Sequence, residues 1–164
     1  MCGGRLKTVV PMSKQRIPFP IRIPFVEQLG LELHGAADGK AELRVDLADA
    51  HLNSWDVAHG GVLMTMLDVA MAQAARSVQT HAPIDRAGVA TIEMKTSFVR
   101  PAEGALRALG NLLHRTSTLA FCEASVFDEA GHLCAHATGT FKYLRALPSA
   151  KGVKLQRGNP PDKE

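Results

Sequence analysis

The chain has 164 residues, 46% of them hydrophobic, and this composition suits one compact domain with a sizeable core. Its formal net charge of +3 arises at the ends, because residues 1–26 carry five basic and no acidic residues while residues 27–148 hold 14 acidic and 10 basic ones. A nucleic-acid-binding domain would carry its positive charge on the folded part, so we expect no nucleic-acid partner.

The three cysteines, Cys2, Cys122 and Cys134, are odd in number and lack zinc-site spacing, which argues against a disulfide framework and a structural metal. No run of residues approaches the roughly 18 apolar positions of a membrane span, and the N-terminus lacks the apolar core of a signal peptide. We therefore predict a cytoplasmic protein without a membrane partner.

Residues 1–20 are predicted to form an irregular or disordered extension, and residues 147–164 a disordered basic tail. The domain predicted between them, residues 21–146, begins with a short helix in "PFVEQLG" that ends at Gly30. The segment "LELHGAADGKAELRVDL" then alternates around Asp38 and Gly39, which predicts two strands joined by a tight turn.

A long helix is predicted from Gly60 to about Val78, with apolar side chains almost all the way round, as in a helix wrapped by other structure. Four segments with a period of two follow it, which predicts four strands at residues 88–101, 104–116, 119–128 and 132–144. The order of elements predicts an α+β fold in which one curved antiparallel sheet of about five to six strands wraps one long central helix.

One carboxylate, Asp68, interrupts the apolar run of this helix. Because burying an unpaired carboxylate is costly, such a group is normally paired or used. The pair Gly60 and Gly61 at the expected start of the helix presents free N–H groups that suit a carboxylate, a phosphate or an oxyanion. Asp68 lies about 12 Å further along the axis, too far to act on the same carbonyl. Either the two features are unrelated, or the Asp68 that serves one Gly60 belongs to a second copy of the chain.

The stretch "HLNSWDVAHGGVLMTMLDVAMA", together with "TIEMKTSFVRPAEGAL" and "VFDEAGHLCAHATGTF", resembles the hotdog-fold acyl-CoA thioesterases of the phenylacetate-degradation and 4-hydroxybenzoyl-CoA type. The similarity spans about residues 24–144. Its most specific part is a His-Gly-Gly motif with an amide side chain before it and a carboxylate after it, which His59, Asn53 and Asp68 provide. The resemblance implies hydrolysis of an acyl-CoA to a carboxylate and free coenzyme A, by a homodimer that is doubled to a homotetramer, with no metal and no other cofactor.

The resemblance also implies a role for each site residue. Gly60 and Gly61 would hold the oxyanion, and Asp68 of the other subunit would act as general base or as nucleophile. Asn53 would orient the attacking water or the carbonyl. His59 would brace the loop rather than transfer a proton.

Two further expectations concern the surroundings of the site. Some relatives carry Thr or Ser one turn after the carboxylate, where this chain has Ala72, so a hydroxyl that positions water must come from Thr65 or from a strand. The phosphates of coenzyme A need cations and donors near the mouth of the site. The residues that resemble such contacts are Arg100, Pro101, Arg115, Thr116 and Ser117.

Other interpretations remain open at this point. His132, Cys134 and His136 alternate and could share one strand face, but no fourth zinc ligand is evident and a packed or interfacial sheet face is the more common meaning of such a row. A non-catalytic acyl-CoA-binding sensor or scaffold is the main alternative function. An enoyl-CoA hydratase is a second one, although its spacing of Asp and His is absent here.

Overall fold

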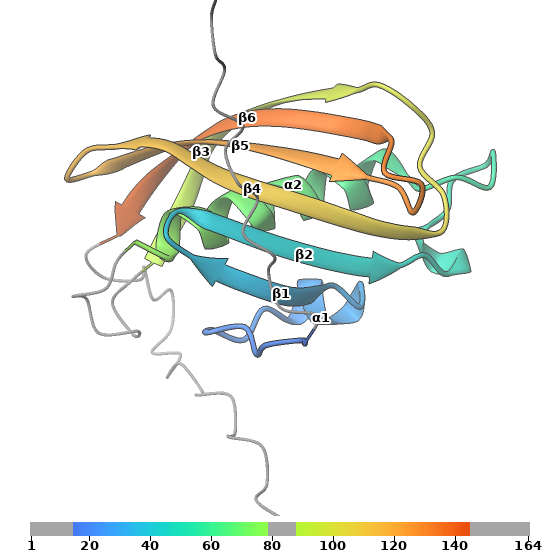
Figure 1. Ribbon diagram of the computed structural model, residues 1–164, viewed down its shortest axis with the longest axis horizontal. Helices are drawn as coiled ribbons and strands as arrows, with labels where there is room; N and C mark the ends of the chain where they lie inside the picture. Colours follow the sequence, from blue (N-terminus) through green and yellow to red (C-terminus); the bar gives the residue numbers. More distant parts are fainter. Residues whose placement is uncertain (1–14, 79–87, 145–164) are drawn as a thin grey trace, which may run out of the picture.

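The computed structural model describes residues 15–78 and 88–144. Six antiparallel strands form one curved sheet, and one long helix, α2, lies against its concave side (Figure 1). The predicted α+β arrangement of one sheet around one helix is confirmed. The elements in chain order are α1 (Pro24–Gln28), β1 (Glu32–Ala37), β2 (Lys40–Asp46), the 3₁₀ helix η1 (Asp49–His51), α2 (Gly60–Arg76), β3 (Gly88–Phe98), β4 (Ala105–Arg115), β5 (Leu119–Phe127) and β6 (Leu133–Leu144).

The short helix α1 has one buried side chain, and the residues that flank it, Ile23 and Leu29, also pack against the core. Val26 is 1% exposed and belongs to the core, while Gly30 ends this segment with a φ of 62°. Ile17 N–H donates to the carbonyl of Leu33 at 2.8 Å, so contact with the sheet begins before the predicted domain boundary at residue 21. The rest of the predicted extension, residues 1–14, and the predicted tail at 147–164 lie outside the described residues.

The turn between β1 and β2 has the geometry that its sequence predicts. Asp38 and Gly39 both have positive φ, 51° and 77°, as a two-residue hairpin of the I′ type requires. β2 then pairs with β4, so the hairpin becomes one half of the sheet rather than a separate unit.

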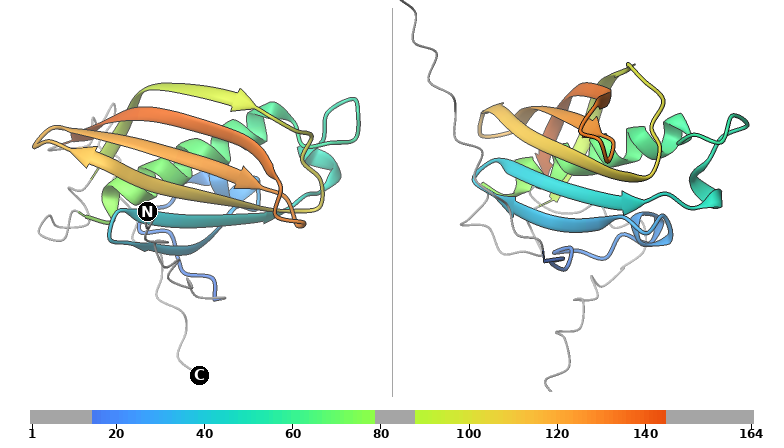
Figure 2. Two further views of the ribbon diagram at one scale, coloured as in Figure 1. Left: turned by 45° about the horizontal axis from the view of Figure 1, so that its top comes forward. Right: turned by 45° about the vertical axis from the view of Figure 1, so that its right-hand side comes forward.

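The strand order β1-β2-β4-β5-β6-β3 puts β3 at an edge of the sheet, although it follows α2 directly in the chain. Figure 2 shows β3 as the outermost strand beside β6, at the edge opposite β1. One side of β3 therefore pairs with β6, and no strand in the described part of the chain pairs with its other side.

Helix α2 approaches the sheet closely because β4 carries a glycine at the contact. A Cβ added to Gly110 would lie 2.3 Å from the carbonyl oxygen of Ala70, which is backbone and cannot turn aside. Met66, Leu67 and Met71 on the same helix are fully buried. The position of α2, and with it the position of Asp68, is thus fixed by backbone packing.

The sheet wraps α2 from one side, as the predicted fold requires. Within residues 15–78 and 88–144 the sheet covers one side of the helix, and we name the side that these residues leave uncovered the open face of α2. It is formed by Gly61, Met64, Thr65, Asp68 and Ala72. These residues recur at the spacing of one helix face, and none of them is fully buried. Met64 is 41% exposed, which is unusual for a large apolar side chain in the middle of a helix.

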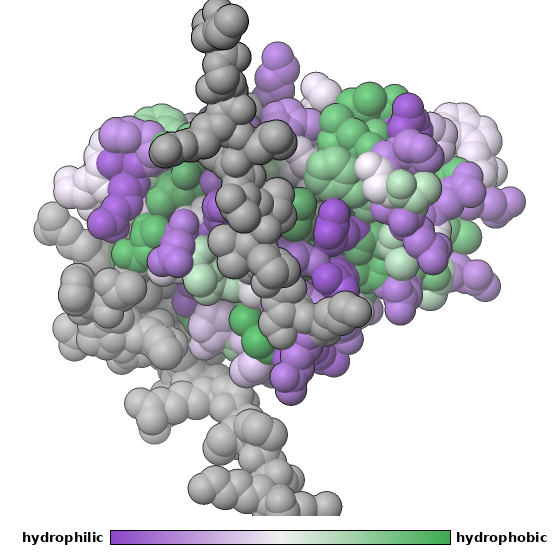
Figure 3. All heavy atoms as spheres, viewed as in Figure 1, coloured by the Kyte–Doolittle hydropathy of each residue, from purple (hydrophilic) through white to green (hydrophobic). Residues whose placement is uncertain are grey.

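The outer face of the sheet is mixed in character. In the view of Figure 3, a green hydrophobic area lies over the right-hand part of β5 and β6, among purple hydrophilic side chains. Phe121 belongs to this outer face, stacks on the ring of His114, and is 38% exposed. None of the helices described is long and apolar enough to span a bilayer.

Candidate active site

The first turn of α2 leaves one of the two predicted glycine donors available. His59 is the N-cap residue, and its Nδ1 accepts the N–H of Gly61 at 2.9 Å. The carbonyl of His59 accepts the N–H of Val62 at 2.9 Å. Gly60 N–H has no acceptor within the described residues. Of the predicted pair, Gly60 can therefore meet a ligand, whereas Gly61 is already used to cap the helix.

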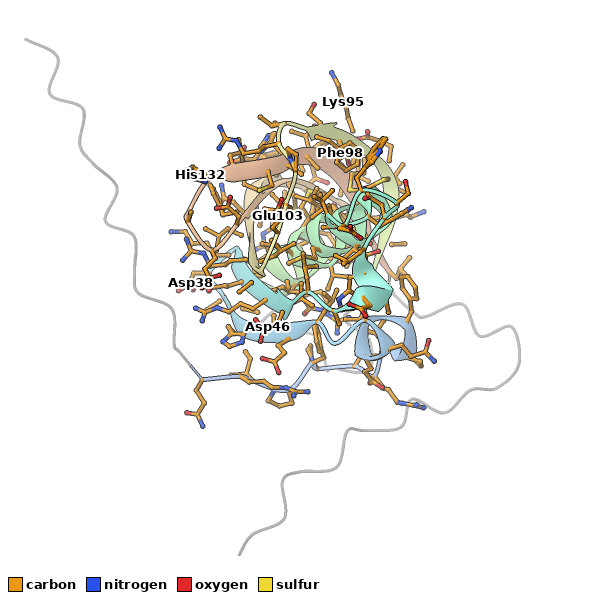
Figure 4. All side chains as sticks on the ribbon, turned by 90° about the vertical axis from the view of Figure 1, so that its right-hand side faces the viewer. Asp38, Asp46, Lys95, Phe98, Glu103 and His132 are labelled. Atoms are coloured by element: carbon orange, nitrogen blue, oxygen red, sulfur yellow. The ribbon has the colours of Figure 1, made fainter. Side chains whose placement is uncertain are left out.

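An aromatic ring narrows the space next to Gly60. A Cβ added there would lie 3.3 Å from Cζ of Phe98 at the end of β3. Figure 4 shows Phe98 beside this end of α2, whereas Lys95 on the same strand points away from the molecule. Because the Phe98 side chain is 54% exposed, it borders the approach to Gly60 from the solvent side.

Asn53 lies in the loop that leads into α2. A bridge between Leu52 and Ala58 closes this loop, and Asn53 Oδ1 accepts the N–H of Trp55 at 2.8 Å. The NH₂ group of Asn53 makes no hydrogen bond to any other described residue. The loop geometry thus uses the oxygen of the amide and leaves its donors for a ligand.

Asp68 is a half-buried carboxylate with one hydrogen-bond donor. Thr91 Oγ1 on β3 donates to Asp68 Oδ1 at 2.7 Å, and no cation in the described part of the chain forms an ion pair with Asp68. Burial raises the pKa of Asp68, and the hydrogen bond from Thr91 opposes this in part. The result is a carboxylate that is more basic than usual, which favours a general base.

Thr91 was not among the predicted site residues. The expected hydroxyl was assigned to Thr65 or to a strand, and Thr65 Oγ1 instead donates to the carbonyl of Gly61 at 2.8 Å. The register of β3 against β6 shifts between Thr91 and Glu93, which leaves Ile92 as an extra, bulged residue. Alternation alone could not have shown that Thr91 faces Asp68, because the bulge changes the phase of the strand.

A groove also missing from the predictions opens beside Asp68, between α1 and the open face of α2. Its volume is about 310 Å³. It is lined by Ile23, Phe25, Val26, Met64, Thr65, Asp68, Val69 and Met94. Met94 faces this groove and Thr91 faces Asp68, so both side chains point toward α2. In a regular strand two residues three positions apart would face opposite sides, and the bulge at Ile92 brings them to the same side.

The residues predicted to contact coenzyme A form two groups. The first group lines a hollow of about 400 Å³ where β4 ends, together with Tyr143. It consists of Arg115, Thr116 and Ser117. Arg115 Nη1 is 3.5 Å from the carbonyl of Val78, which follows the C-terminal end of α2. Tyr143 was not predicted; its hydroxyl donates to the carbonyl of Ala75 at 3.2 Å.

The second group, Arg100 and Pro101, lies near the other end of the helix. The carbonyl of Ala102 accepts the N–H of Ala58, just before α2 begins, at 2.9 Å. Since α2 has 17 residues, its two ends are about 25 Å apart. One protomer therefore does not bring Arg100 and Arg115 together.

The row His132, Cys134 and His136 does not form a joint site. His132 Nδ1 lies 3.1 Å from Asp128 Oδ2, and His136 Nδ1 lies 3.1 Å from Ser125 Oγ. Cys134 is buried. Across residues 15–78 and 88–144 there is no group of three or more His, Cys, Asp or Glu side chains that could hold a metal ion.

A six-stranded antiparallel sheet curved around one long helix defines a hotdog-fold protein. The chain belongs to the thioesterase superfamily, whose profile matches residues 56–135. It is 34% identical over 127 residues to a Halobacterium salinarum protein named "Putative esterase VNG_1336C", covering 71% of this chain and 82% of that protein.

Solved structures agree with this family. Conserved protein PA5202 from Pseudomonas aeruginosa has a TM-score of 0.70 and 31% identity, covering 76% of this chain and 97% of that chain. A variant of the phenylacetic acid degradation protein PaaI from Thermus thermophilus has a TM-score of 0.65 and 27% identity, covering 74% of this chain and 100% of that one. The predicted hotdog fold is confirmed, and the family and its relatives support a hydrolase.

Proposed function

We propose that the protein is an acyl-CoA thioesterase, which hydrolyses its substrate to a carboxylate and free coenzyme A. The observation that carries the proposal is Asp68, a carboxylate whose pKa is raised by burial and which an uncharged hydroxyl, rather than a cation, holds in place. A structural carboxylate is normally solvated or paired with a base, so this arrangement favours proton transfer.

The catalytic unit we propose is a homodimer. Gly60 and Asp68 are on one rigid helix, about 12 Å apart along its axis. Two copies of α2 that pack antiparallel through their open faces would bring Gly60 of one protomer to Asp68 of the partner subunit. The exposed Met64 and the unpaired edge of β3, where Ile92 is 57% exposed, support such an interface because both leave groups that a second copy can cover.

The chemistry follows from these groups. Gly60 N–H donates to the thioester carbonyl oxygen and stabilises the negative charge that develops there. Asp68 takes a proton from water, the hydroxide attacks the carbonyl carbon, the C–S bond breaks, and the proton passes to the departing thiolate. If Asp68 attacks instead, its carboxylate oxygen bonds to the carbonyl carbon, the C–S bond breaks to release the coenzyme A thiolate, and water then cleaves the resulting anhydride at the aspartyl carbon, giving a proton to the thiolate. A single turnover in ¹⁸O water separates these routes, since only attack by Asp68 leaves the first product carboxylate without the label.

The proposed dimer also gives the two cationic groups a common ligand. Within one chain Arg100 and Arg115 are at opposite ends of α2, whereas an antiparallel partner places Arg115 of the partner subunit at the same end as Arg100. Both guanidinium groups could then contact the phosphates of one coenzyme A. The proposed assembly therefore uses both groups of predicted contact residues at each site.

The first test measures thiol release from a panel of aryl-CoA and straight-chain acyl-CoA substrates by the wild type and by Asp68→Ala. We expect turnover by the wild type and its loss in the variant. Binding without turnover by the wild type would favour a sensor or scaffold, and loss of absorbance from an unsaturated acyl-CoA would favour a hydratase.

The second test examines whether the site is shared between two chains. Asp68→Ala and Asn53→Ala variants are unfolded together and refolded as a mixture. If each site takes Asn53 from one protomer and Asp68 from the other, mixed dimers keep one intact site and the mixture recovers about a quarter of wild-type activity. A mixture that remains as inactive as the separate variants would contradict a shared site.

A further inference from the structure

We infer that the groove between α1 and α2 receives the acyl group of the substrate, that this group is uncharged and apolar, and that Phe25 limits its length. This inference rests on the proposed thioesterase function. It assigns a substrate class and a specificity-determining residue to the same site.

The position of the groove relative to Asp68 is the first argument. The acyl chain is attached to the carbon that the activated water attacks, so it must leave the reaction centre within a few ångströms of Asp68. Asp68 itself lines the groove, together with Thr65 one turn before it. A volume of about 310 Å³ is at the lower end of the usual ligand pockets, which suits the acyl part of the substrate and not the whole thioester.

The chemistry of the lining is the second argument. Six of the eight lining residues are apolar, and none is basic. Of the two polar ones, Thr65 already donates its hydroxyl proton to the carbonyl of Gly61. A second carboxylate in the groove would lose its hydration among apolar side chains, and the described lining offers no cation to compensate for this loss. An acyl group with a terminal carboxylate is therefore disfavoured, and an apolar chain or ring is favoured.

Phe25 is the lining residue best placed to set the length of this chain. Its neighbour Val26 is 1% exposed and anchors α1 in the core, and the carbonyl of Phe25 accepts the N–H of Leu29 at 3.2 Å. The Phe25 side chain borders the groove but is 59% exposed. It therefore adds little to the core, and a change in its size should alter the groove without unfolding the domain.

The test compares kcat/KM across straight-chain acyl-CoA substrates from acetyl to dodecanoyl. Each added methylene should increase kcat/KM about fourfold until the groove is filled. Phe25→Ala should shift the optimum to longer chains and Phe25→Trp to shorter ones. Phe121→Ala removes a partly exposed ring from the outer face of the sheet and should leave the profile of the wild type unchanged. A glutaryl thioester should be cleaved at least about tenfold more slowly than the pentanoyl thioester, because its terminal carboxylate would be desolvated among apolar side chains with no basic residue in the described lining.

The outcomes separate this inference from the function on which it rests. If the wild type cleaves no acyl-CoA of the series, the proposed thioesterase function fails. If the wild type is active but both Phe25 variants keep its chain-length profile, only the assignment of the groove is overturned. If Phe25→Ala instead weakens dimerisation, measured by sedimentation, and the profile is unchanged, a second copy of the chain occupies the groove.

Discussion

Replacing Gly60 by proline tests the proposed oxyanion donor, because it removes the N–H and puts the ring carbon Cδ in the place of the hydrogen. Gly60 is the first residue of α2, the position at which helices accept proline most readily. His59 before it has a ψ of 136°, which is the extended conformation that a residue preceding proline prefers. Gly60 N–H donates to no other described residue, so the substitution breaks no hydrogen bond in that part of the fold.

Gly60→Ala is the matched control. It adds the same Cβ, which would lie 3.3 Å from Cζ of Phe98, but it keeps the N–H. Loss of a single oxyanion donor lowers kcat by about 10²- to 10³-fold, or roughly 3–4 kcal/mol. We expect a loss of this size in Gly60→Pro and a clearly smaller one in Gly60→Ala. Thermal melting should show both variants folded.

The assay is thiol release under saturating substrate, which reports kcat. Equal activity of the two variants near that of the wild type would refute the role of Gly60 N–H. Equal and large losses in both would attribute the effect to the added carbon against Phe98 and would refute it as well.

Three further predictions concern the position and ionisation of Asp68. Burial raises the pKa of Asp68 in the folded state, so the contribution of Asp68 to stability is fully present below the pKa of this group in the unfolded chain and is lost as the pH rises through its folded pKa. Asp68→Asn should therefore increase the free energy of unfolding, measured with urea at neutral pH. Below about pH 3.9 the same substitution should not increase it. Thr91→Val removes the hydrogen bond that lowers the pKa of Asp68, so the acidic limb of the pH–rate profile should move to higher pH, whereas Thr91→Ser should leave it in place. Gly110→Ala puts a methyl group against the carbonyl of Ala70 and should lower the free energy of unfolding, measured with urea, by about 3 kcal/mol, at the upper end of overpacking effects. A variant as stable as the wild type would show that α2 can shift on the sheet.

The sequence was informative where local chemistry determines structure. The hairpin at Asp38 and Gly39 and the start of α2 at Gly60 follow from short-range rules, and the structure has both. The strand segments were also predicted in the right order, because alternation depends only on neighbouring residues. These elements account for most of the described fold.

Features that depend on distant contacts were not predictable from the same patterns. The apolar pattern of α2 predicts a wrapped helix but not which of its residues the sheet leaves uncovered, and in the described part of the chain Met64 and Asp68 lie on the open face. The N–H of Gly61 is hydrogen-bonded and that of Gly60 is available because of the rotamer of His59, which no sequence pattern specifies. Thr91 and Phe25 reach the site from segments far from Asp68 in the chain, so only the folded structure identifies them.

The bulged residue in β3 limits which insertions and deletions this strand can tolerate. Thr91 and Met94 are three positions apart and both face inward, which requires one unpaired residue between them. Ile92 is this unpaired residue. Loss of that codon would let the ladder run evenly, and either Thr91 or Met94 would turn to the opposite surface. Insertions and deletions in this strand should therefore be far less tolerated than substitutions of Ile92, whose own side chain is more than half exposed.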